Sequence, residues 1–129
     1  MPAVVDSSGW IEYFTDGPNA ERFAGVITDV DALILPSIII IEVYRRVMRE
    51  AGASDALAVA ALMKQGKVVP LDDRLAVLAA ETSHRHRLPL ADGVIYTTAQ
   101  SASAELLTQD SDLEGLPGVT YIAHPKRKS

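Results

Sequence analysis

The stretch Ala3-Val4-Val5-Asp6-Ser7-Ser8-Gly9 decides the fold that this sequence predicts. Its first half is short, apolar and β-branched, which is typical of a buried strand, and the Asp-Ser-Ser-Gly that follows is typical of the start of a helix. A buried strand that leads directly into a helix is the unit from which parallel sheets are built. The same alternation recurs along the rest of the chain.

Four further short apolar segments have the character of buried strands. They are residues 32–35, 68–69, 106–107 and 119–122. Helices are expected between them, near residues 8–14, 21–26, 37–50, 54–65, 73–87 and 91–101. Ser37 is expected to cap the third helix and Gly52 to end it, while Asp72 or Asp73 caps the fifth. This alternation predicts an α/β fold of three layers, with helices on both faces of a central, mainly parallel sheet of about five strands.

The composition is that of one globular domain. Domains most often have roughly 100–150 residues, and this chain has 129, of which 48% are hydrophobic and 22% charged. The absence of cysteine excludes disulfides, thiolate nucleophiles and cysteine-ligated metals. The longest apolar stretch, residues 32–43, is shorter than the roughly 20 residues of a membrane span. With no signal-peptide pattern at residues 1–6, we expect a cytoplasmic protein with no membrane partner. Residues 1–125 are expected to form the domain and residues 126–129 a basic tail.

Four acidic residues occupy positions where carboxylates have chemical consequences. In an open α/β sheet, ligands bind outside the carboxyl ends of the strands, and Asp6 and Asp110 follow the first and fourth predicted strands. Asp92 lies near the start of a helix and could point to the same end. Glu42 interrupts an apolar run in a helix that should be mostly buried, so its charge is expected to be neutralised or paired.

Carboxylates that converge on one crevice repel one another, and a divalent cation offsets that repulsion. Oxygen ligands without cysteine favour Mg²⁺ or Mn²⁺ over zinc. Because Mg²⁺ uses few protein carboxylates, it leaves room for the oxygens of a substrate phosphate. One or two such ions would activate a water and stabilise the attacking and leaving oxygens in phosphodiester hydrolysis.

Most of these acids also have a purely structural interpretation. Asp6 could simply cap the first helix. Asp92 could be an ordinary acidic residue in the first turn of its helix. Asp110 and Asp112 could serve a turn, where aspartate is common. Taken singly, none of these positions decides between structure and chemistry.

Together, four motifs resemble those of the PIN-domain ribonucleases. They are Val4-Val5-Asp6-Ser7-Ser8, Ile41-Glu42 within an apolar helix, Leu90-Ala91-Asp92, and Leu106-Leu107-Thr108-Gln109-Asp110. They occur in the family's order and approximate spacing, and the resemblance covers essentially the whole chain. A single-domain chain of this length is similar to the VapC-type toxins of toxin–antitoxin pairs. The resemblance implies a PIN-like nuclease domain over residues 1–125.

The resemblance also implies an activity and its residues. The activity is that of a Mg²⁺- or Mn²⁺-dependent endoribonuclease. The acidic cluster that holds the metal and catalyses would be Asp6, Glu42, Asp92 and Asp110. Ser8 and Thr108 match small polar residues beside the first and last acids, and Asp112 falls in a loop where a second acid is frequent. The family further implies a homodimer held inactive by a cognate antitoxin, whose tail occupies the acidic groove.

Three arginines, at positions 45, 46 and 49, follow Glu42 on the same predicted helix. They could bind RNA phosphates, because guanidinium groups match phosphate oxygens well. An ion pair of Glu42 with Arg45 or Arg46, contributing only tenths of a kcal/mol, is an alternative, and so is a solvated helix face. The net charge of −5 does not exclude RNA, because without the four cluster acids the chain is nearly neutral.

Other functions remain for comparison. Haloacid-dehalogenase phosphatases need a second Asp two residues after the first and a later Lys in the site, whereas this chain has Ser8 at the position of the second Asp. Phosphoacceptor receiver domains are excluded because they need a Lys after the penultimate strand, and this chain has none there. A catalytically inactive PIN-like module, whose acidic pocket receives a basic segment of a partner, is the principal alternative. His84, His86 and His124 lack the spacing of a metal motif and are expected at the surface.

Overall fold

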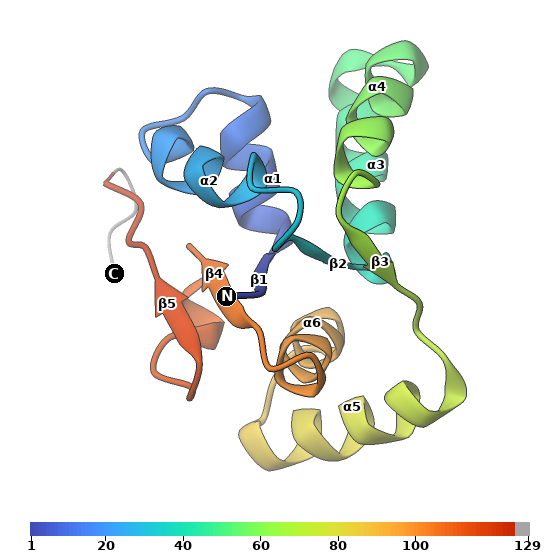
Figure 1. The fold of residues 1–129 in the computed structure, drawn as a ribbon, viewed down its shortest axis with the longest axis vertical. Helices are drawn as coiled ribbons and strands as arrows, with labels where there is room; N and C mark the ends of the chain where they lie inside the picture. Colours follow the sequence, from blue (N-terminus) through green and yellow to red (C-terminus); the bar gives the residue numbers. More distant parts are fainter. Residues whose placement is uncertain (126–129) are drawn as a thin grey trace.

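The computed structural model describes residues 1–125; the predicted basic tail, residues 126–129, lies outside the described residues. The strands of the described part are all parallel. They are β1 (Ala3–Val5), β2 (Ile34–Pro36), β3 (Lys67–Val69), β4 (Glu105–Thr108) and β5 (Val119–Tyr121). β4 lies between β1 and β5, and β2 pairs with β3 (Figure 1). The α/β prediction is confirmed.

The predicted single sheet is divided in two. β1, β4 and β5 form a three-stranded sheet, whereas β2 and β3 form a two-stranded one. A single parallel bridge between Ala3 and Leu33 connects the two sheets. β1 and β2 are each three residues long and are followed at once by helices, so they diverge before a longer ladder can form. The five parallel strands that the sequence predicts are therefore present, but they form two sheets joined by this bridge.

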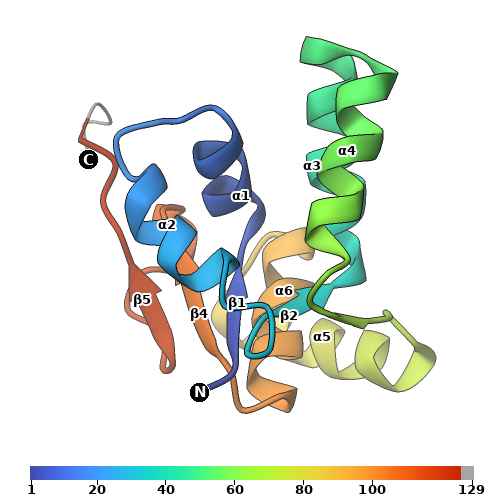
Figure 2. The same cartoon turned by 45° about the horizontal axis from the view of Figure 1, so that its top comes forward.

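Helices cover both faces of this arrangement. They are α1 (Ser7–Phe14), α2 (Ala20–Ile27), α3 (Ser37–Ala51), α4 (Ala53–Met63), α5 (Asp73–His86) and α6 (Leu90–Ser101), with a short 3₁₀ helix, η1 (Ser111–Leu113). α1 and α2 pack on one side of the strands and α5 and α6 on the other, while α3 and α4 form a projecting hairpin (Figures 1 and 2). Within residues 1–125, no helix is long and apolar enough to cross a membrane.

The helix ends follow the predictions with one correction. Asp72 caps α5 by accepting a hydrogen bond from the Leu75 amide, and Gly52 ends α3 with a φ of +95°. Ser37 does not cap α3, because it is already the first helical residue. Its Oγ instead accepts a hydrogen bond from the Leu71 amide, 3.1 Å away. Ser37 therefore connects the start of α3 with the segment that leads into α5.

Burial in the core differs between the central strands and α3. Val4, Val5 and Leu106 of the two central strands are fully buried, so these strands hold the residues that follow them in place. In α3, by contrast, only one side is covered: Ile39 and Val43 are buried, but Ile41 is 58% exposed. The run around Glu42 is thus less buried than its apolar composition predicts.

Candidate metal centre

The pairing of β1 with β4 brings two distant acids to one edge of the sheet. Val5 is in register with Leu107, and the Asp6 amide donates a hydrogen bond to the Leu107 carbonyl oxygen. Because both strands end here and run in the same direction, Asp6 and Asp110 emerge together. The first turn of α6 presents Asp92 to the same place.

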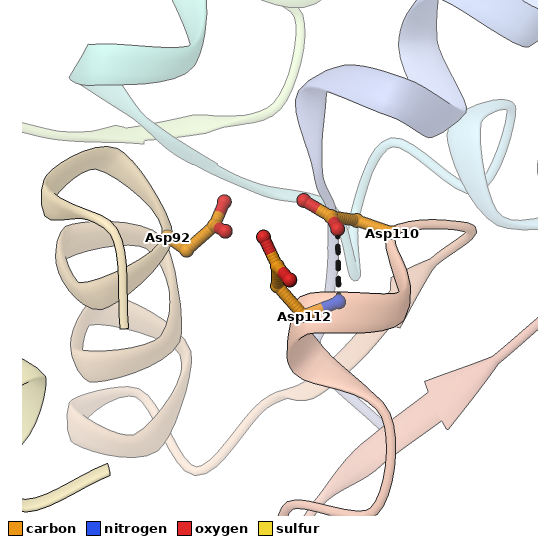
Figure 3. Close-up of side chains that lie close together, drawn as sticks. All are labelled: Asp92, Asp110 and Asp112. Atoms are coloured by element: carbon orange, nitrogen blue, oxygen red, sulfur yellow. Dashed lines mark hydrogen bonds between the residues drawn. The ribbon is translucent and has the colours of Figure 1, made fainter. Parts of the chain in front are cut away.

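Three carboxylates meet at this edge. Asp92, Asp110 and Asp112 each offer an oxygen, and these oxygens all lie within 4.8 Å of one another. Figure 3 shows the three side chains converging from α6 and from the turn that begins η1. Asp110 also accepts a hydrogen bond from the Asp112 amide, 2.9 Å away. The turn interpretation of Asp110 is therefore correct as well, and this turn brings Asp110 and Asp112 together.

Asp6 lies beneath this group and is 3% exposed. Its carboxylate accepts hydrogen bonds from the hydroxyls of Ser8, at 2.6 Å, and Thr108, at 2.7 Å. It also accepts a hydrogen bond from the Gly9 amide and so caps α1, as the purely structural interpretation of Asp6 predicted. The Thr108 hydroxyl accepts a hydrogen bond from the Asp110 amide in turn. In this structure Ser8 and Thr108 orient the acids, a role that the sequence did not reveal.

Burial and the negative charges of neighbouring acids raise the pKa values of Asp6 and Asp92. Burial raises the pKa of Asp6 from 3.8 to about 6, although hydrogen bonds from Ser8 and Thr108 oppose the shift. Burial, followed by the negative charges of Asp110 and Asp6, raises the pKa of Asp92 to about 7. Acids that repel one another in this way, with oxygens this close, fit the charge and the ligand preference of a hard divalent cation.

Glu42 approaches from α3 and stands outside the three-carboxylate group. It accepts a hydrogen bond from the Ser7 hydroxyl, and Ser7 is the neighbour of Asp6. Arg46 forms its ion pair with Glu50, at 2.9 Å, in place of the predicted one with Glu42. Both partners of that pair are about half exposed, so the pair contributes at most tenths of a kcal/mol. Glu42 is partly exposed and bonded to Ser7, which satisfies a charge that the sequence placed in a buried helix.

A second polar network beside the centre was missed by sequence reasoning. Glu12 is 6% exposed and accepts a hydrogen bond from the Asn19 amide at 2.8 Å. The Gln109 amide group and His124 Nε2 each lie 3.5 Å from its carboxylate. His124 is thus partly buried against an acid, and its expected surface position was wrong. No sequence pattern pointed to this network; the structure shows that a Cβ at Gly17 would lie 2.2 Å from a Glu12 oxygen, so glycine leaves room for that carboxylate.

The metal-free protein, prepared with a chelator, is expected to lose stability as pH rises from about 4 to about 7. Over this window the folded state retains protons on Asp6 and Asp92 that the unfolded chain has released, because their folded pKa values are about 6 and about 7. The stability contributed by these protons is complete below the unfolded pKa and lost above the folded one. Thermal melts across this range would measure the loss. Asp92→Asn should flatten the profile; an unchanged profile would contradict the assignment.

The fold and the clustered acids at the carboxyl ends of its strands define an α/β domain with an acidic site. The chain belongs to the PIN-domain family, whose model matches residues 3–119. The resemblance given by the four motifs is thereby confirmed. A comparison with curated protein sequences gave no match.

Solved structures share this fold at low sequence identity. One is a toxin–antitoxin complex from Klebsiella pneumoniae, with a TM-score of 0.76, 20% identity and coverage of 92% of this chain and 95% of that one. Another is DNA-bound VapBC from Salmonella typhimurium, with a TM-score of 0.71, 15% identity and coverage of 95% of this chain and 98% of that one. A third is the Mycobacterium tuberculosis toxin VapC20, described as cleaving the sarcin-ricin loop. Its TM-score is 0.68 and its identity 15%, with coverage of 87% of this chain and 91% of that one.

Proposed function

We propose that this protein is a metal-dependent endoribonuclease and the toxin of a toxin–antitoxin pair. The observation that carries the proposal is the convergence of Asp92, Asp110 and Asp112, with Asp6 directly beneath them. The cap of α1 and the turn at η1 account for Asp6 and Asp110 singly, but they do not require the carboxylates of Asp92, Asp110 and Asp112 to face one another against their mutual repulsion. Membership of the PIN family and the toxins among the similar structures support the same activity.

In this proposal the acids have distinct positions. Asp6, Asp92 and Asp110 would hold Mg²⁺ or Mn²⁺, with Asp112 beside them. Glu42 would complete the catalytic set from α3, on the Ser7 side of the centre. When bound, the cation supplies positive charge that stabilises the attacking and leaving oxygens of phosphodiester hydrolysis. Ser8 and Thr108 keep Asp6 oriented. Ser8 is partly exposed and could also contact a substrate phosphate, whereas Thr108 is fully buried and its predicted contact with substrate is not supported.

RNA phosphates would be bound along α3. Arg45, Arg46 and Arg49 line, together with Glu42, a groove of about 690 Å³. Glu42 also accepts a hydrogen bond from Ser7, the neighbour of Asp6, so a strand bound in this groove would pass close to the proposed metal centre. Guanidinium groups in such a position neutralise the backbone of an RNA strand, and Arg46 would exchange its exposed pair with Glu50 for a phosphate.

The proposed partners follow from the similar structures, several of which are toxin–antitoxin complexes. A cognate antitoxin would cover the acidic site, and the toxin would be a homodimer in the cytoplasm. The alternative is a catalytically inactive binding module whose acidic pocket receives a basic segment of a partner; the family and the similar structures favour the nuclease. Only a test for cleavage separates these two functions.

Purified protein is expected to cut RNA internally with Mg²⁺ or Mn²⁺ and to stop when EDTA is added. Asp6→Asn should abolish both the cleavage and the gain in melting temperature that Mn²⁺ gives, because an ion stabilises only a folded state that binds it. Asparagine can still cap α1, so the fold should survive. Gel analysis of a labelled RNA and thermal melts are the measurements. Cleavage that persists in EDTA or in the variant would exclude the metal centre.

A further inference from the structure

We propose that a pocket between α1 and α3 is a subsite for one of the two nucleotides that flank the scissile phosphate. This inference rests on the proposed ribonuclease function and adds a place for the substrate. The pocket has a volume of about 510 Å³, which is within the range of cavities that hold small organic ligands. Its walls come from the length of α1, from Glu42 and Arg46 of α3, and from Gln109 and His124.

The pocket adjoins the metal centre through two of its lining residues. The Ser8 hydroxyl donates a hydrogen bond to Asp6 and accepts one from the backbone amide of Gln109. Gln109 lies between Thr108, which also binds Asp6, and Asp110. Any group bound against Ser8 and Gln109 is therefore immediately beside the acids that would hold the cation. A nucleotide there would be covalently adjacent to the phosphate being cut.

The chemistry of the lining favours a nucleotide over a simple anion. Carboxylates of Glu12 and Glu42 would repel a bare phosphate, but they accept hydrogen bonds from ribose hydroxyls and from base N–H groups. Arg46 and His124 offer positive or donor groups for the phosphate of the same nucleotide. Arg46 also lines the α3 groove, so the strand can continue from this subsite onto Arg45 and Arg49.

The floor of the pocket is pre-organised by the Glu12 network. Asn19 donates one hydrogen bond to the Gln109 side chain, at 3.1 Å, and another to the carbonyl oxygen of Ala123, at 3.2 Å. Together with the bond from the Asn19 amide to Glu12, these bonds join α1, the turn before α2, the residue after β4 and the segment after β5. Because binding to a rigid site loses less conformational entropy, this network makes the pocket a better receptor than a surface groove.

Short RNA oligonucleotides that lack or contain one nucleotide on each side of a mapped cleavage point would test the proposal. Binding is measured by fluorescence anisotropy in an Asp6→Asn background, which prevents cleavage, and kcat/KM is measured in otherwise wild-type protein. The added nucleotide should improve affinity and kcat/KM roughly tenfold on one side only, the value of a good charged hydrogen bond. His124→Ala and Arg46→Ala should each remove most of that gain.

His84→Ala is the matched control, because His84 lies exposed near the end of α5 and outside the pocket. It should retain the full gain. Thermal melts verify that His124→Ala is folded, and Arg46, which is exposed, provides a second variant that does not disturb the core. An equal gain in all variants, or no gain on either side, would overturn the subsite. Absence of cleavage by wild-type protein would refute the ribonuclease function and the subsite with it, whereas cleavage without a gain on either side would overturn the subsite alone.

Discussion

Replacing Asp110 by asparagine is expected to lower RNA cleavage by more than about 100-fold. Loss of a group that merely supports a metal ligand costs up to about 100-fold, and Asp110 belongs to the carboxylate group itself. Asparagine retains the oxygen that accepts the Asp112 amide hydrogen bond, so η1 should still form. Initial rates at saturating Mn²⁺ and a Mn²⁺ titration of the melting temperature would measure the effect.

The matched control is Asp31→Asn, an exposed aspartate in the turn that leads to β2. It changes the net charge by the same amount and should leave cleavage within about twofold, because exposed charges are well screened. If both variants lose activity equally, the effect of Asp110→Asn is one of net charge. If Asp110→Asn cleaves normally, Asp110 has no part in the centre.

Gly9→Ala is expected to destabilise the protein by about 1–3 kcal/mol, as overpacking of a filled core does. A Cβ at this position would lie 2.5 Å from Val5 Cγ1 and 2.7 Å from Phe23 Cε1. Both neighbours are fully buried, so relief requires α1 to move away from β1. Because α1 carries Ser8 and Glu12, cleavage should fall as well. Urea unfolding monitored by circular dichroism gives the stability change.

Gly25→Ala provides the comparison, since nothing lies within 4 Å of a Cβ placed at that position in α2. Alanine is favoured over glycine inside a helix, so a gain of roughly 0.5–1 kcal/mol is expected. Opposite signs for the two substitutions would show that packing, and not helix propensity, decides at Gly9. A stabilised Gly9→Ala protein would contradict the packing of α1 on β1.

The elements and the positions of the acids could be predicted because the signals for them are local. A buried strand that turns directly into a helix is visible in the seven residues from Ala3 to Gly9. Parallel strands that pair must place the residues after them together, so Asp6 and Asp110 could be matched from two short segments. Asp92 was singled out by its place near a helix start and Glu42 by its place in an apolar run, and the family motifs then grouped them with the other acids. The structure places Asp92 in the carboxylate group and Glu42 outside it, bonded to Ser7.

Features that depend on how distant segments pack together could not be predicted from the sequence pattern. The division of the sheet follows from how soon β1 and β2 turn into helices after one shared bridge. Asp112 enters the carboxylate group only because η1 turns it back toward Asp92. Glu12 and His124 are 112 positions apart in the sequence, and no periodicity links them. Their pairing depends on where the segment after β5 returns across α1.

The placement of β4 between β1 and β5 has a consequence for how the cell makes this protein. The central sheet joins the first strand of the chain to the last two, so an incomplete polypeptide on the ribosome lacks both the middle strand and the turn carrying Asp110. Nascent chains therefore cannot assemble the acidic group until β4 and the turn that carries Asp110 have been translated. For the proposed nuclease, the cell has the time needed to translate residues 1–110 in which to supply whatever restrains it.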